Sequence, residues 1–144
     1  MDLLPLIVAD VFELAGRFRD EGEAIAKQVG QTQARWQVMS AASAEPRTVP
    51  QIARRLGVTR QNVQRIADAL VEENWATFDA NPDHKGSPHL VLNARGRAAL
   101  AKITKAAGLS HAQLARMLGG TDIGALHRGL LRLIDALNDR DNSR

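Results

Sequence analysis

Polar side chains with the chemistry to read DNA bases gather at the start of one amphipathic segment, residues 60–73. A helix turns by about 100° per residue, so Gln61 and Arg65 lie opposite the apolar stripe, with Gln64 on the flank. A glutamine amide can bridge adenine, and an arginine guanidinium can bridge guanine with two hydrogen bonds. We therefore predict that these three side chains read base edges in a major groove. The apolar stripe consists of Val63, Ile66, Ala67 and Leu70.

Basic side chains surround this segment, in a window from Arg47 to Ala67 that contains no acid. Such a cluster suits backbone phosphates, which supply much of the affinity of proteins for DNA. A generic pair of amphipathic helices with a solvated charged face would give a similar pattern. The flanking segments must therefore decide between a DNA-binding unit and such a generic pair. The predicted phosphate-binding residues are Arg47, Arg54, Arg55, Thr59, Arg60 and Lys85.

A second, shorter helix is expected directly before the reading segment, over residues 49–56. Thr48 is a good N-cap, and Gln51 three residues later completes a capping box. Gly57 stands where a left-handed C-terminal residue is wanted, and Thr59 can cap the next helix. The two helices and their sharp turn predict a helix-turn-helix.

A short hairpin should follow the reading helix. Residues 75–80 and 89–92 are typical of strands, and residues 81–88 contain Asn-Pro-Asp and Gly-Ser-Pro, which favour turns. Asn93 then caps another helix. This order of elements predicts a mainly α fold with a small β-hairpin wing.

The arrangement resembles the multiple-antibiotic-resistance regulator (MarR) family of bacterial transcription factors. The resemblance is carried by Ile-Ala-Arg-Arg-Leu-Gly at 52–57, by Val-Gln-Arg-Ile-Ala-Asp-Ala-Leu at 63–70, by the helix containing Trp36, and by Leu-Asn-Ala-Arg-Gly-Arg at 92–97. It implies a homodimeric repressor or regulator that binds a pseudo-palindromic DNA operator and responds to a small-molecule effector. It also implies a winged helix-turn-helix lobe over 31–93 and a helical dimerisation region over 1–30 and 94–144.

The wing tip departs from the family pattern, in which the tip usually carries an Asp with one or two Arg and the Arg enters a minor groove. Here the tip is Asp83-His84-Lys85-Gly86. Lys85 can hold a phosphate but lacks the flat fork of Arg, so minor-groove reading by this wing is open. Protonated His84 would raise DNA affinity below about pH 6.5, whereas an exposed histidine without a role is the alternative.

Apolar residues recur at alternating steps of three and four near both ends of the chain, as in the seam of a helix that packs against other helices. A short internal core would explain either stripe alone, but two stripes at opposite termini favour dimerisation. The long segment 94–118 between them is expected to form one helix bent at Gly108, and two helices broken there, with Ser110 as a cap, are the alternative. The predicted dimerisation residues are Leu4, Ile7, Val11, Leu14, Ile123, Leu126, Leu130, Leu133 and Leu137.

The family resemblance also implies an effector cavity between the dimer helices and the DNA lobe. Phe12, Trp36 and Met39 are candidates to line it. Apolar residues at helical spacing are more often simply core, so a structural role for all three is the competing interpretation.

Several other functions find little support. The chain has no cysteine, which excludes a thiol redox switch, and it lacks nucleotide-binding, nucleophile-elbow and His-Glu-x-x-His motifs, so neither an enzyme nor a cofactor is expected. Its four histidines are scattered, and no metal site is predicted. Acids interrupt the apolar N-terminus and no membrane span is present, so a cytoplasmic protein is expected. A net charge of +3 is too small for DNA packaging, which leaves a winged-helix protein-interaction module as the main alternative.

Overall fold

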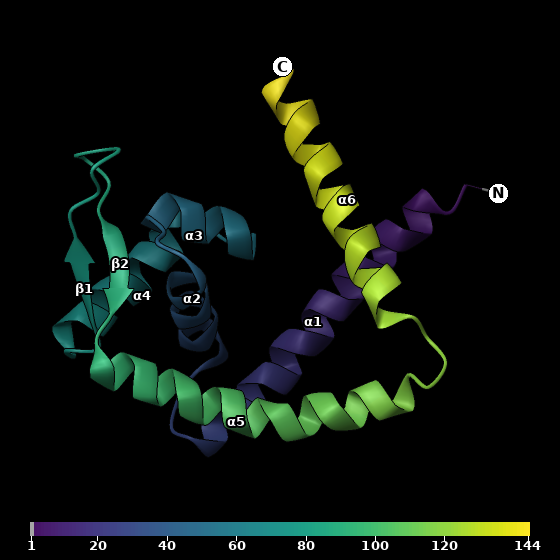
Figure 1. Ribbon diagram of the computed structural model, residues 1–144, viewed down its shortest axis with the longest axis horizontal. Helices are drawn as coiled ribbons and strands as arrows, with labels where there is room; N and C mark the ends of the chain where they lie inside the picture. Colours follow the sequence, from purple (N-terminus) through teal and green to yellow (C-terminus); the bar gives the residue numbers. More distant parts are fainter. Residues whose placement is uncertain (1) are drawn as a thin grey trace. The chain divides into compact units, whose positions relative to one another are not determined.

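The computed structural model describes residues 2–144, which form helices and one two-stranded antiparallel hairpin (Figure 1). The predicted fold class, mainly α with a small β-hairpin wing, is confirmed. By their internal contacts these residues fall into two units, one ending at Ser110 and one spanning His111–Arg144. The division into a 31–93 lobe and a dimerisation region stays a prediction. The elements are α1 (Leu4–Gln28), α2 (Gln33–Ala44), α3 (Val49–Leu56), α4 (Arg60–Glu72), β1 (Ala76–Asp79), β2 (His89–Leu92), α5 (Ala94–Met117) and α6 (Ile123–Asn142).

Local hydrogen bonds define both helices of the helix-turn-helix. The Gln51 amide donates to the Thr48 hydroxyl at 3.3 Å, and the Thr48 amide donates to the Gln51 side chain at 2.8 Å. Gly57 ends α3 with a φ of 67°, a conformation that glycine adopts without steric cost. The Thr59 hydroxyl then accepts from the Asn62 amide at 3.1 Å and starts α4. The predicted capping box, turn and second cap are therefore all confirmed.

A compact core fixes the orientation of α4. Its apolar stripe is buried, as the spacing predicted, against residues from α2, α3, the hairpin and α5. The most deeply buried side chains of this core include Met39, Ile52, Leu70, Leu90 and Ile103. Because each neighbouring element contributes to this core, the exposed side of α4 is held on a rigid support.

The hairpin is attached to the start of α3 as well as paired with itself. Ala76 lies opposite Leu92 and Asp79 opposite His89, so β1 is shorter than the predicted 75–80. The Leu90 amide donates to the Arg47 carbonyl at 3.0 Å, which joins β2 to the chain entering α3. The connecting loop stands at the end of the hairpin away from α5 (Figure 1).

The helices α5 and α6 begin at capped residues. The Asn93 side chain accepts from the Gly96 amide at 3.0 Å, and the Asp122 side chain accepts from the Ala125 amide at 2.9 Å. As expected, α5 continues through Gly108 without a break. None of the helices within residues 2–144 has the length and apolarity required to cross a bilayer.

Candidate nucleic-acid interface

The three predicted base-reading side chains are all exposed on α4. Two of them are held by neighbours on the same helix. The Arg65 guanidinium donates to the Asn62 side-chain oxygen at 2.6 Å, and the Gln64 amide donates to Asp68 at 2.9 Å. One bond leaves the guanidinium with further N–H donors for a partner. The first half of α4 therefore presents oriented polar groups to solvent.

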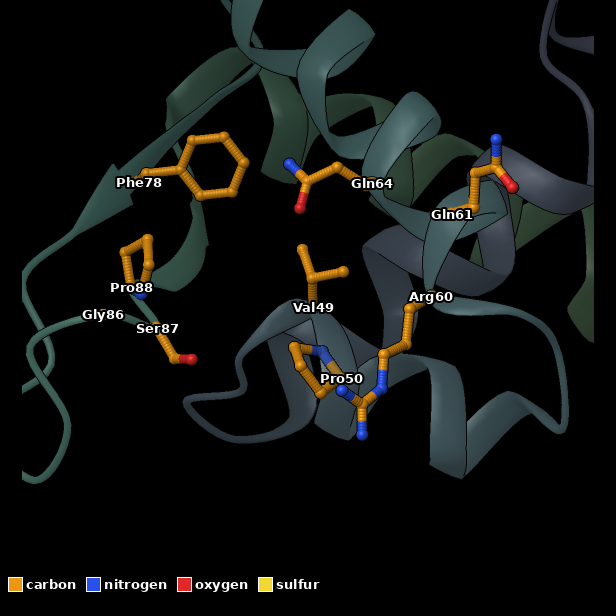
Figure 2. A pocket seen from close by; sticks show the side chains of 9 residues that line it. All are labelled: Val49, Pro50, Arg60, Gln61, Gln64, Phe78, Gly86, Ser87 and Pro88. Carbon is orange, nitrogen blue, oxygen red and sulfur yellow. The ribbon is translucent and has the colours of Figure 1, made fainter.

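A groove of about 600 Å³ separates α4 from the start of α3 and the wing. Figure 2 shows Gln64 extending over this groove towards Phe78 and Val49, while Gln61 points away from it. Its walls combine apolar surface with the polar side chains of α4. The lining residues are Val49, Pro50, Arg60, Gln61, Gln64, Phe78, Gly86, Ser87 and Pro88.

Most of the predicted phosphate-binding residues are exposed. Arg54, Arg55, Arg60 and Lys85 take part in neither of the ion pairs found among residues 2–144. Thr59 is also exposed, although its hydroxyl already serves as the cap of α4. These side chains form a basic rim beside the reading face, which is the exposed side of α4 that carries Gln61, Gln64 and Arg65.

Arg47 is placed differently from its predicted role. Its guanidinium donates to the Ala41 carbonyl at 2.6 Å and pairs with Glu45 at 2.8 Å, and its side chain is only 15% exposed. These bonds brace the end of α2 against the chain that enters α3. The guanidinium of Arg47 is thus engaged within the fold, and its contact with phosphate stays a prediction.

The wing tip is an exposed, braced loop. The Asn81 side chain donates to the Ser87 carbonyl at 3.1 Å and accepts from the Asp83 amide at 3.0 Å. This bracing leaves His84 and Lys85 in solvent at the tip. Within residues 2–144, no three His, Cys, Asp or Glu side chains gather closely enough to hold a metal ion.

A cluster around Trp75, which the sequence reading missed, joins the end of α4 to α2 and α5. Arg35 pairs with Glu73 and lies 5.2 Å from the centre of the Trp75 ring, and Arg95 lies 5.9 Å from the same centre. The hydrogen bond from Arg35 lowers the pKa of Glu73, and the charges of Arg35 and Arg95 act in the same direction. No local pattern could have found this cluster, because Arg35 and Glu73 are 38 residues apart.

The candidate effector residues are not brought together. Met39 is fully buried in the core and Trp36 nearly so, whereas Phe12 is 75% exposed on α1. A hollow of about 410 Å³ does lie between α1, α2 and the α3–α4 turn, but its lining includes Phe18, Gln37 and Val58 and none of the three candidates.

Comparisons with known proteins found a matching family profile, sequence relatives and solved structures of similar fold. The sequence profile of the MarR family matches residues 30–85. An uncharacterized protein of Mycobacterium tuberculosis is 48% identical over 136 residues, which cover 94% of this chain and 95% of the relative. The M. tuberculosis transcriptional regulator MosR has a similar fold, with a TM-score of 0.72 at 18% identity over 96% of this chain and 99% of that one. The transcriptional repressor CouR, bound to a 23-mer DNA duplex, gives a TM-score of 0.68 at 24% identity over 94% of this chain and 98% of that one.

Proposed function

The chain belongs to the MarR family, and we propose that it is a sequence-specific regulator of transcription that binds double-stranded DNA and acts as a repressor. The observation that carries this proposal is the exposed, oriented reading face of α4 beside a basic rim with no acid between residues 47 and 67. In this proposal Gln61, Gln64 and Arg65 contact base edges. Arg54, Arg55, Arg60 and Lys85 contact phosphates.

We further propose that the regulator is a homodimer. The predicted stripes on α1 and α6 are largely exposed within a single chain, among them Ile7, Val11, Leu126 and Leu130. Apolar area in water is unfavourable by about 25 cal/mol per Å², and large exposed apolar patches mark interaction sites. A second copy is the natural partner, because a two-fold dimer presents two α4 helices, about 34 Å apart, to the two halves of a pseudo-palindrome.

The proposal is tested by fluorescence-anisotropy titrations of the purified protein against a pool of duplexes, with varied salt and a non-specific competitor. We expect selective binding with a steep salt dependence, because phosphate contacts release counterions. Binding that lacks either sequence selectivity or salt dependence would contradict the proposal. Absence of any binding would favour the alternative, a winged-helix module for protein contacts.

Arg65→Ala separates base reading from phosphate binding. We expect it to relax the preference at one base pair and to reduce specific binding by about 1–3 kcal/mol, since a bidentate contact is lost. Arg54→Ala is the matched control, because it removes the same group from α3. It should weaken binding to all DNA sequences alike. It should also lower the slope of log affinity against log salt concentration by about one unit. Unchanged sequence preference in Arg65→Ala would show that another face of α4 reads the bases.

A further inference from the structure

Asp68 is the first acid after a long basic stretch, and it lies on the exposed side of the reading helix. Residues 47–67 contain no acid, and Asp68 is placed one turn after Gln64. An acid here is unexpected on a surface that approaches phosphates, because like charges repel. Its one side-chain hydrogen bond within residues 2–144 comes from the Gln64 amide nitrogen, at 2.9 Å. The structure therefore links this acid to a residue of the reading face.

The bond fixes which way the Gln64 amide faces. An ionised carboxylate only accepts hydrogen bonds, so the amide must turn its NH₂ group towards Asp68 and its carbonyl oxygen elsewhere. Figure 2 shows this amide over the groove, with its nitrogen on the side of Phe78 and its oxygen on the side of Val49. Gln64 thus presents an acceptor to whatever lies against α4. In the major groove, adenine N6 and cytosine N4 are the donors, whereas guanine and thymine offer acceptors only.

We propose that Asp68 is a specificity-determining positioning residue, which keeps the Gln64 carbonyl turned away from itself and over the groove, where it accepts from the amino group of adenine or cytosine. This inference rests on the proposed function, because it concerns how the same α4 surface selects its operator. The charge of Asp68 has a second, separable effect. It repels phosphates, so it lowers the affinity for all DNA sequences alike.

The test measures binding of the full-length protein to its selected duplex and to duplexes with each base pair replaced in turn. On one strand, at one pair of each half-site, the wild type should prefer adenine or cytosine over guanine or thymine by roughly tenfold. Asp68→Ala frees the amide to rotate, so the preference at that pair should fall to about twofold. Asp68→Asn keeps a side-chain oxygen that can accept from Gln64, so this variant should retain part of the preference that Asp68→Ala loses.

Glu72→Ala is the matched control for charge, because it removes an exposed acid one turn further along α4 that has no hydrogen bond to a reading residue. Both alanine variants should bind non-specific DNA more tightly, but only Asp68→Ala should change the preference at one pair. Equal changes in the two variants, or an intact preference in Asp68→Ala, would overturn the inference while leaving the regulator itself standing. If the wild type selects no duplex at all, the proposed function fails and this inference fails with it.

Discussion

Leu130→Asp is expected to separate the proposed homodimer and to weaken operator binding more than a hundredfold. Leu130 lies in the middle of the apolar face of α6 and is 40% exposed in the single chain. A carboxylate buried there without a partner disfavours association by more than about 3 kcal/mol, which exceeds a hundredfold in the dissociation constant. A monomer would then engage one half-site at a time and lose the advantage of two linked contacts.

Light scattering coupled to gel filtration reports the mass, and anisotropy reports the affinity for whole and half operators. Ala136→Asp is the matched control, since it adds the same carboxylate to an exposed position about 120° around α6 from Leu130. The control should remain a dimer with wild-type affinity. A dimeric Leu130→Asp protein with unchanged affinity would show that this face of α6 is not the interface. If both variants were monomeric, the added negative charge, and not its position on α6, would explain the loss of the dimer.

The parts of the fold that could be predicted from sequence are those determined within three or four residues. The Thr48 capping box, the left-handed Gly57, the Thr59 cap and the continuous α5 each depend on neighbours along the chain. Helical periodicity likewise predicted the buried stripe of α4, and therefore also which side of this helix is exposed. Periodicity determines which residues share a face, and that was sufficient to locate the candidate interface.

Periodicity does not determine what a long polar side chain contacts, and there the predictions were least complete. Arg47 fits a basic cluster by composition, but its guanidinium reaches back to Ala41 and Glu45. The orientation of Gln64 depends on the rotamers of two side chains one turn apart. The Trp75 cluster depends on how α2, α4 and α5 pack together. These features follow from the tertiary structure, which no local pattern encodes.

Gly96→Ala is expected to destabilise the fold by about 3 kcal/mol, at the high end of the usual cost of overpacking. Gly96 lies in the first turn of α5, and a Cβ atom there would come well inside 3.0 Å of the Trp75 carbonyl oxygen. Relief requires α5 to move away from the turn after α4. That movement would stretch the bonds from Asn93 to the carbonyls of Asn74 and Trp75, now 2.6 and 3.1 Å long.

Urea unfolding at one fixed protein concentration measures the effect, because the stability of the proposed dimer depends on concentration. Gly108→Ala is the matched control on the same helix, since a Cβ there would meet no atom within 4 Å. It should stabilise the protein by about 1 kcal/mol, because alanine is the better helix former. Opposite signs for one substitution at two positions of α5 would locate the cost in the contact with Trp75. A neutral Gly96→Ala would mean that the start of α5 is not held against this turn, and that the α4–α5 junction can change its geometry easily.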